Sequence, residues 1–233
     1  MLPNAWDVAS ARAVVAAGFP VVATTSGGVA DVLGYEDEER APAAEMLAAA
    51  ARIARSVDVP VTVDAESGYG LPPDELVDAL LSAGVAGCNL EDSDHKAGGL
   101  TAPSHQADRL AAIRRAAADR AYGLVINARV DVFLADFGER HEEYLDDGIN
   151  RARAYLDAGA DCVYPIFLHN ERAIARFTEA VAGPVNILAL PQAPPISRLA
   201  ELGVARVSYG SGIQRRLWQN LAAILAEIRG GAQ

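Results

Sequence analysis

The chain has 233 residues, of which 51% are hydrophobic and 22% are charged, and its formal net charge at pH 7 is −11. This excess of acidic groups argues against nucleic-acid binding through a basic surface. No apolar run approaches the roughly 18 residues that a membrane span needs, and the N-terminus lacks the basic region and apolar run of an export signal. We therefore expect a cytoplasmic protein that binds neither nucleic acid nor membranes. Cys88 and Cys162 lie in apolar runs, and we expect them to be buried and reduced rather than paired.

Strand-like and helix-like runs alternate eight times along the chain with no linker between them, which predicts a single domain over residues 1–233. Short apolar runs predict strands at Leu2–Asn4, Val21–Thr24, Val61–Asp64, Gly87–Leu90, Leu124–Ala128, Cys162–Tyr164, Val185–Leu188 and Val207–Tyr209. Amphipathic, alanine-rich runs predict helices at Val8–Ala17, Ala43–Ser56, Pro73–Ala83, His105–Ala118, His141–Ala158, Glu171–Ala180, Ile196–Glu201 and Ile213–Arg229. Continuously apolar strands are typical of a parallel sheet covered on both faces. Eight repeats predict an α/β fold of the TIM-type (β/α)8 barrel class, with an open doubly wound sheet as the alternative.

Acidic residues follow two neighbouring predicted strands, at the end of the barrel where active sites lie. Asp64 and Glu66 are two residues apart, so in an extended chain their carboxylates point the same way, and Glu91 ends the next strand. Carboxylates at close range need a cation, a shared proton or an arginine between them. Oxygen ligands without histidine suit Mg²⁺ held partly through water. The alternative, for Asp64 and for the neighbouring Asp92, is that the acid caps the helix that follows.

Three further positions at strand ends are candidates for binding an anionic substrate. The turn Ser26-Gly27-Gly28 offers backbone N–H groups and a hydroxyl, although such a turn is also an ordinary loop. Arg129 ends an apolar strand and could grip a carboxylate or offset the acids, which is compatible with an ion pair to Asp131 or Glu91. Asn186 could donate to a substrate carboxylate or stabilise a turn.

Taken in order, these residues resemble the isocitrate lyase/phosphoenolpyruvate mutase superfamily over nearly the whole chain. The resemblance is carried by Asn4-Ala5-Trp6-Asp7, Ser10-Ala11-Arg12, Thr25-Ser26-Gly27-Gly28-Val29-Ala30, Gly34-Tyr35-Glu36-Asp37, Asp64 to Gly70, Asn89-Leu90-Glu91-Asp92-Ser93 and Asn127-Ala128-Arg129-Val130-Asp131. It implies a Mg²⁺- or Mn²⁺-dependent barrel enzyme that cleaves or forms C–C or P–C bonds in α-oxo or 2-hydroxy carboxylates through an enolate-like state.

The resemblance also implies roles for individual residues. Asp64 resembles the principal metal ligand, with Asp37, Glu66 and Glu91 reaching the ion largely through water. Ser26, Gly27 and Gly28 resemble the turn that binds the α-oxo carboxylate, and Arg129 resembles the guanidinium beside it. We expect the catalytic residues to be Arg129, Lys96, His95 and Glu91, and the protein to be a homo-oligomer, a dimer or a tetramer.

The mobile loop after the fourth strand departs from the superfamily pattern. Isocitrate and methylisocitrate lyases carry a Lys-Arg/Lys-Cys-Gly-His segment there, whereas this loop reads Ser93-Asp94-His95-Lys96-Ala97-Gly98-Gly99-Leu100 and has no cysteine. Lys96, the only lysine of the chain, lies close to the position of the family's loop lysine, and His95 could replace the missing acid. The Lys-x-Asn-Ser segment of phosphoenolpyruvate mutase is absent as well.

These observations predict a metal-dependent lyase that cleaves a C–C bond in a small α-oxo or 2-hydroxy carboxylate, such as oxaloacetate or a substituted malate. Two alternatives stay open. One is a mutase or hydrolase of P–C bonds that acts on phosphonopyruvate or phosphoenolpyruvate. The other is a catalytically weakened member of the superfamily that binds a dicarboxylate without turning it over.

Overall fold

A computed structural model describes residues 1–136 and 140–231. The strands are β1 (Asn4–Ala5), β2 (Val22–Thr24), β3 (Val61–Asp64), β4 (Gly87–Glu91), β5 (Val125–Val130), β6 (Cys162–Pro165), β7 (Asn186–Leu188) and β8 (Arg206–Ser208). The helices are α1 (Val8–Ala16), α2 (Ser26–Leu33), α3 (Ala43–Ala54), α4 (Pro73–Ala83), α5 (Pro103–Asp119), the 3₁₀ helix η1 (Asp131–Asp136), α6 (His141–Asp157), α7 (Glu171–Ala180), α8 (Ile196–Glu201) and α9 (Gly212–Arg229).

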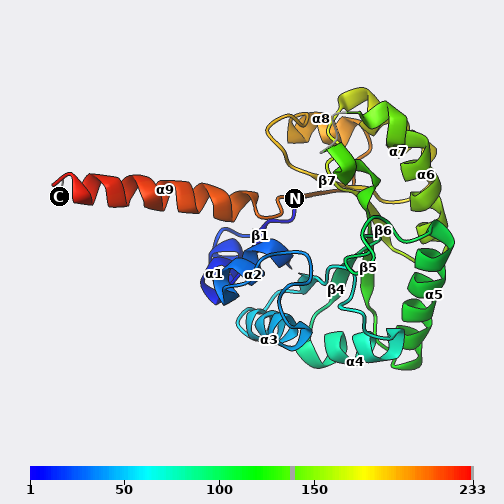
Figure 1. Ribbon diagram of the computed structural model, residues 1–233, viewed down its shortest axis with the longest axis horizontal. Helices are drawn as coiled ribbons and strands as arrows, with labels where there is room; N and C mark the ends of the chain where they lie inside the picture. Colours follow the sequence, from blue (N-terminus) through cyan, green and yellow to red (C-terminus); the bar gives the residue numbers. More distant parts are fainter. Residues whose placement is uncertain (137–139, 232–233) are drawn as a thin grey trace.

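The strands form a closed parallel barrel surrounded by helices (Figure 1). β1 to β6 pair in chain order, and β7 pairs with β8. Two isolated parallel bridges complete the ring: Val163 pairs with Val185 just before β7, and Ser208 of β8 pairs with Leu2 just before β1. The (β/α)8 barrel expected from the sequence is therefore confirmed.

Apolar side chains of the strands and of the inner helix faces form the main core. Ile126 of β5 and Val163 of β6 are fully buried, as are Leu76, Val77 and Leu80 on the inner face of α4. Each such side chain stabilises the fold by about 1.5–3 kcal/mol relative to exposure to water. The alternation of short apolar runs with one-sided apolar helices in the sequence thus becomes a barrel whose strand ends are free to carry polar groups.

The expected strands and helices are all present, with bounds shifted by up to a few residues, but two elements were missed. One is η1, and the other is α2, because Ser26, Gly27 and Gly28 form the first turn of a helix rather than a loop. Glycines are weak helix formers and concealed this helix. They are required by crowding: a β-carbon on Gly28 would lie 2.6 Å from Thr25 Cγ2. Cys88 and Cys162 are buried and unpaired, as expected.

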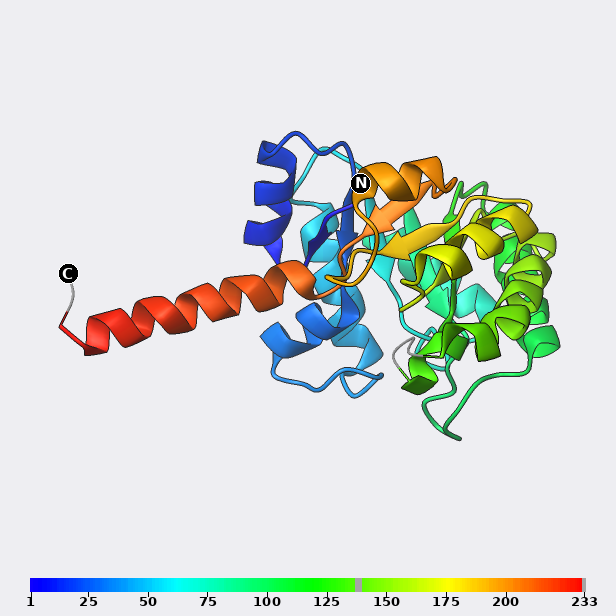
Figure 2. The same cartoon turned by 90° about the horizontal axis from the view of Figure 1, so that it is seen from above.

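The last helix, α9, extends away from the barrel as an isolated arm (Figures 1 and 2). Its buried residue is Gln214 near the start, whereas its large apolar side chains are between 42% and 62% exposed, at Leu217, Trp218, Leu221, Ile224, Leu225 and Ile228. Within the described residues, no helix is both long enough and apolar enough to cross a membrane.

Candidate active site

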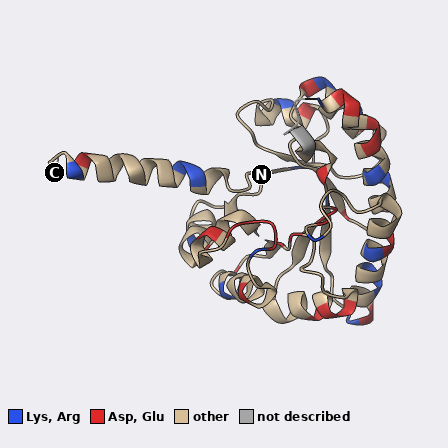
Figure 3. Cartoon of the chain, viewed as in Figure 1, with Lys and Arg blue, Asp and Glu red and all other residues tan. Residues whose placement is uncertain are grey.

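A cavity of about 560 Å³ lies at the carboxyl ends of the barrel strands. Side chains that follow β3, β4 and β5 line it, together with the loop between α2 and α3 and the first turn of α9. Figure 3 shows acidic residues on that loop and at the strand ends inside the ring of helices. The cavity therefore occupies the position where barrel enzymes carry their active sites.

Asp64 ends β3 and is fixed by the neighbouring strand and helix. Its Oδ2 accepts hydrogen bonds from the backbone N–H of Ser26 at 3.0 Å and from Ser26 Oγ at 2.9 Å. The Asp64 N–H donates to Thr24 Oγ1 at 2.9 Å. The other carboxylate oxygen, Oδ1, is buried without a hydrogen-bond partner. Ser26, predicted to bind a substrate carboxylate, therefore also contacts the predicted metal ligand Asp64 directly, which the sequence did not indicate.

Glu66 lies two residues after Asp64, in a left-handed backbone conformation with φ of 49°. Its Oε1 accepts a hydrogen bond of 2.6 Å from the Glu39 N–H, while Oε2 is buried and has no partner. Burial raises the pKa of Glu66 to about 8, and Asp64, Asp37 and Glu91 add to the effect. The side chains of Asp64 and Glu66 thus bring two unpartnered carboxylate oxygens to one cavity.

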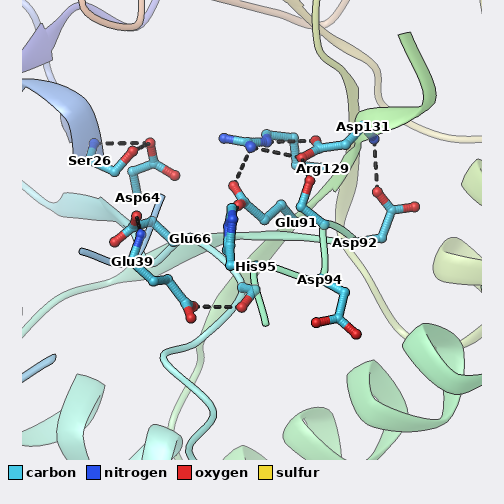
Figure 4. Close-up of polar contacts among 12 residues, drawn as sticks. Ser26, Glu39, Asp64, Glu66, Glu91, Asp92, Asp94, His95, Arg129 and Asp131 are labelled. Atoms are coloured by element: carbon cyan, nitrogen blue, oxygen red, sulfur yellow. Dashed lines mark hydrogen bonds and ion pairs between the residues drawn. The ribbon is translucent and has the colours of Figure 1, made fainter. Parts of the chain in front are cut away.

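Arg129 joins two of the acids across β4 and β5 (Figure 4). Its Nε donates to Asp131 Oδ1 at 2.7 Å and one terminal nitrogen donates to Asp131 Oδ2 at 2.8 Å. The same terminal nitrogen forms an ion pair with Glu91 Oε2. Burial opposes the charge on Arg129, but Asp131 and Glu91 outweigh it and raise the Arg129 pKa above its usual value. The ion pairs considered from the sequence are therefore both present.

His95 contacts Glu91 from the loop that follows β4. Its Nε2 forms a hydrogen-bonded ion pair with Glu91 Oε1, and this contact raises the pKa of His95. Burial raises the pKa of Glu91 to about 7, against the lowering effects of Arg129 and His95. The loop folds back on itself, because Ser93 pairs with Leu100 in an antiparallel bridge. It thus places His95 in the cavity lining beside Glu91.

Asp37 joins the acids from the loop between α2 and α3. It lines the cavity, and a β-carbon on Gly27 would lie 2.6 Å from Asp37 Oδ2, so Gly27 allows this close approach. Burial raises the pKa of Asp37, followed by the charge of Asp64. The four acids predicted to surround a metal ion therefore all line one cavity.

Asp92 is neither a helix cap nor a cavity residue, and its role is structural. It is fully buried, and its Oδ2 accepts hydrogen bonds from Arg151 at 2.8 Å and from Tyr155 at 2.6 Å. Its Oδ1 accepts from the Asp131 N–H at 2.8 Å. Asp92 therefore neither caps the next helix, which begins at Pro103, nor lines the cavity. It anchors α6 to the ends of β4 and β5.

Four predicted site residues, Lys96, Asn186, Gly27 and Gly28, are not among the residues that line the large cavity. Lys96 lines a smaller neighbouring cavity of about 160 Å³, and a β-carbon on Gly70 would lie 2.7 Å from its Nζ. Asn186 is buried in β7, where its Nδ2 donates to Ser208 Oγ at 3.1 Å. A direct contact of either side chain with a substrate stays a prediction.

Sequence reasoning missed several residues of the cavity region. Glu38 and Arg40 line it from the loop after Asp37, and Arg215 lines it from the first turn of α9. Glu39, between the first two, holds Glu66 instead. The signal of Glu38, Glu39 and Arg40 in the sequence was only a run of charges beside Asp37, which is equally typical of an exposed loop.

The cavity offers oxygen donors of the kind that a divalent cation needs. Among residues 1–136 and 140–231, no three His, Cys, Asp or Glu side chains converge closely enough to hold a metal on their own. Mg²⁺ usually keeps several waters and takes only one or two protein carboxylates. The unpartnered Oδ1 of Asp64 and Oε2 of Glu66 are oxygen donors of this kind, so the residues fit a hydrated Mg²⁺ better than a fully protein-ligated metal.

Comparison with known proteins gives matches over nearly the whole chain. The family model described as phosphoenolpyruvate phosphomutase matches residues 1–229. An uncharacterized protein of Mycobacterium tuberculosis is 39% identical over 211 residues, which cover 91% of this chain and 77% of that protein. A probable 2-methylisocitrate lyase of Corynebacterium glutamicum is 31% identical, with 98% of this chain and 76% of that protein covered. The chain also matches the crystal structure of a candidate phosphonomutase of Burkholderia cenocepacia, with 41% sequence identity and a TM-score of 0.90. The match covers 97% of this chain and 92% of that one.

Proposed function

The chain belongs to the phosphoenolpyruvate phosphomutase family, whose superfamily contains lyases and mutases of carboxylates, and from this membership we propose a specific reaction. The protein is a Mg²⁺- or Mn²⁺-dependent lyase that cleaves a C–C bond in a small α-oxo or 2-hydroxy carboxylate, through an enolate-like state of the substrate. The carrying observation is the pair of buried carboxylate oxygens without partners, Asp64 Oδ1 and Glu66 Oε2, in a cavity that also holds Ser26 and Arg129.

Asp64 is the direct metal ligand in this proposal, with Glu66, Glu91 and Asp37 acting largely through water. A bound Mg²⁺ supplies Lewis acidity, which stabilises negative charge on the substrate oxygen as the neighbouring bond breaks. The acids themselves also favour a bound cation, because carboxylates this close repel one another when they are all ionised.

The first turn of α2 and Arg129 orient the substrate. The N–H groups of Gly27 and Gly28 belong to the first turn, where no carbonyl of the helix accepts them, and the N-terminal end of a helix favours an anion. In this proposal they bind the substrate carboxylate, and the Ser26 hydroxyl joins them by turning its one hydrogen from Asp64 to the substrate. Arg129 lies across the cavity and offsets charge that develops during cleavage.

His95 donates the proton that C–C cleavage requires, because the carbanion-like product must be protonated before it leaves. Its contact with Glu91 raises its pKa, which keeps a proton on the ring closer to neutral pH. Lys96 follows directly in the same loop and adds positive charge in the smaller neighbouring cavity, which His95 also lines. This arrangement supplies an acid where the superfamily's lyases use a cysteine.

The test is turnover of purified protein with Mg²⁺ against 2-methylisocitrate, oxaloacetate, 2,3-dimethylmalate, phosphonopyruvate and phosphoenolpyruvate, with products identified by NMR. We expect cleavage of at least one carbon-only acid, and loss of that activity in the Asp64→Asn variant and on chelation with EDTA. Activity that is indifferent to EDTA and to Asp64→Asn would contradict the proposal.

The second candidate function is P–C bond chemistry, and the Burkholderia relative favours it. In that case phosphonopyruvate or phosphoenolpyruvate would be the substrate in the panel. For a mutase, His95→Gln would leave the rate nearly unchanged, since transfer of the phosphoryl group between the carbon and the enolate oxygen needs no protonated carbanion. A weakened family member would instead bind oxalate with Mg²⁺ while showing no turnover across the panel.

A homo-oligomer, either a dimer or a tetramer, is also proposed. It is supported by the large apolar side chains that α9 exposes away from its own barrel. The cytoplasmic location stays a prediction from the sequence.

A further inference from the structure

Two facing segments next to the cavity have unusual backbone conformations. Glu38 and Glu39 have φ values of 66° and 57°, and Glu66 and Tyr69 have φ values of 49° and 57°. Residues other than glycine rarely adopt this left-handed backbone region, and they keep it only where surrounding contacts hold them in place. The turn formed by residues 66–71, which we call the Glu66 turn, therefore depends on what holds it from outside.

Glu39 holds the Glu66 turn from the loop between α2 and α3. Its Oε1 accepts hydrogen bonds from Ser67 Oγ at 2.5 Å and from the Tyr69 N–H at 2.6 Å. Its own N–H donates to Glu66 Oε1 at 2.6 Å, and Figure 4 shows Glu39 beside Glu66. Because Glu66 Oε1 is occupied in this way, Oε2 is the oxygen left without a partner.

Arg109 of α5 holds the same turn by its backbone. Its guanidinium donates to the carbonyl of Ser67 and, at 3.4 Å, to that of Leu71. It packs so closely that a β-carbon on Gly68 would overlap it, and Gly68 has a φ of 92°. Among the described residues Arg109 forms no ion pair. Its hydrogen bonds in this part of the chain all go to the turn.

Neither residue lines the large cavity. Glu39 and Arg109 line the smaller cavity of about 160 Å³, whereas Glu38 and Arg40, on either side of Glu39, line the large one. Glu39 and Arg109 therefore have no place for direct contact with a substrate in the large cavity. Among the described residues, the side-chain hydrogen bonds of both go to the turn that carries Glu66.

We propose that Glu39 and Arg109 are positioning residues that together clamp the Glu66 turn and so keep Glu66 Oε2 available to a bound divalent cation. This inference rests on the proposed metal-dependent function. Groups that orient metal ligands from outside typically change metal affinity by about 10- to 100-fold when they are removed. The clamp explains how a glutamate in an unfavourable backbone conformation keeps one orientation.

The test measures Mg²⁺ and Mn²⁺ binding by calorimetry in the absence of substrate. We expect Glu39→Ala and Arg109→Ala each to weaken binding by about 10-fold or more. Glu39→Gln, whose amide oxygen still accepts from Ser67 and Tyr69, should stay within about 3-fold of wild type. The matched controls are Glu36→Ala and Arg115→Ala, since both side chains are exposed and neither contacts the turn in the described residues.

Hydrogen exchange of the metal-free protein gives a second readout. The Tyr69 amide should exchange faster in Glu39→Ala, because its acceptor is lost, and at the wild-type rate in Glu36→Ala. Wild-type protein that binds neither ion would overturn the proposed metal site and the clamp with it. Wild-type binding that Glu39→Ala and Arg109→Ala leave intact would overturn the clamp alone.

Discussion

Asp64 and Ser26 are joined by two hydrogen bonds to the same carboxylate oxygen, one from the Ser26 N–H and one from its hydroxyl. The predicted metal ligand and the predicted anion site are therefore one rigid unit. In the structure the single hydrogen of the Ser26 hydroxyl goes to Asp64 Oδ2, and in the proposed function the hydroxyl turns to the substrate carboxylate when substrate binds.

The first prediction concerns Ser26→Ala. Losing the hydroxyl removes one hydrogen bond to a charged group, which is worth about 1.5–3 kcal/mol, or roughly 10- to 150-fold in binding. We expect KM for the α-oxo acid to rise within this range. The Mg²⁺ affinity should fall much less, because the backbone N–H still holds Asp64 Oδ2. Steady-state kinetics and metal calorimetry on the same preparation separate the two effects, and an unchanged KM would contradict the substrate role.

The second prediction concerns Asp64→Asn, which keeps the shape of the side chain and removes its charge. We expect the rise in melting temperature on addition of Mg²⁺ to disappear and turnover to fall by about 10³-fold or more, since metal catalysis supplies several kcal/mol. Thermal unfolding with EDTA and with Mg²⁺ measures the first effect. The control is Asp119→Asn at the end of α5, because Asp119 is exposed and is not among the residues that line the cavity.

The barrel and the acids at its strand ends could be predicted because they follow from local pattern. Apolar runs separated by amphipathic runs determine the strands and helices, and parallel strands carry their end residues to one mouth. Asp64, Glu66, Glu91 and Arg129 were found in this way. The pairing of Arg129 with both Glu91 and Asp131 was also within reach, since β4 and β5 are neighbours in register.

Other features depend on contacts between distant segments and have no local signal. Helix α2 was hidden by two glycines that are required by crowding against Thr25 and Asp37. Glu39 acts on Glu66, 27 residues away, through a backbone N–H that any residue type other than proline could supply. The structural role of Asp92 has no local signal either, because its partner Arg151 lies 59 residues further along the chain.

The third prediction concerns pH. An acid whose pKa is higher in the folded than in the unfolded chain holds its proton only in the folded state between the two values, so stability falls as pH rises through that interval. Burial raises the pKa of Glu66 to about 8 and that of Glu91 to about 7, from ordinary values near 4.5. The raised pKa of His95 acts in the same direction.

Metal-free protein should therefore lose a few kcal/mol of stability between about pH 5 and pH 8, a fall in Tm of about 5 °C or more. Mg²⁺ should reduce this dependence, because it replaces the protons. Calorimetric unfolding at several pH values with EDTA and with Mg²⁺ measures both slopes. Glu66→Gln should flatten the slope with EDTA, and a Tm that is level or rises over this interval would contradict the prediction.

The fourth prediction concerns the buried ion pair between Asp92 and Arg151, whose side chains are 0% and 8% exposed. Removing one partner leaves a buried charge uncompensated, so Arg151→Met should lower the free energy of unfolding by about 3–5 kcal/mol. Removing both charges with Asp92→Asn and Arg151→Met should cost less than the sum of the single changes. Urea unfolding of the four proteins measures the coupling, and strictly additive losses would contradict it.

The fifth prediction concerns the arm α9. Leu221, Ile224, Leu225 and Ile228 lie three or four residues apart and form one apolar stripe, which its own barrel leaves uncovered. Apolar stripes of this kind mark interaction surfaces, and a second copy of the chain is the occupant that a homo-oligomer provides. Light scattering during size-exclusion chromatography should therefore give a dimer or tetramer for the wild-type protein.

Placing charges in the stripe should break this assembly, because the carboxylates would have to be buried without partners. Leu221→Glu with Ile224→Glu should yield a monomer whose barrel still unfolds cooperatively. The matched control adds the same charge on the opposite face, with Gln219→Glu and Ala223→Glu, and should keep the wild-type mass. A monomeric wild-type protein would reject the homo-oligomer, whereas equal masses for all three proteins above monomer size would place the interface elsewhere.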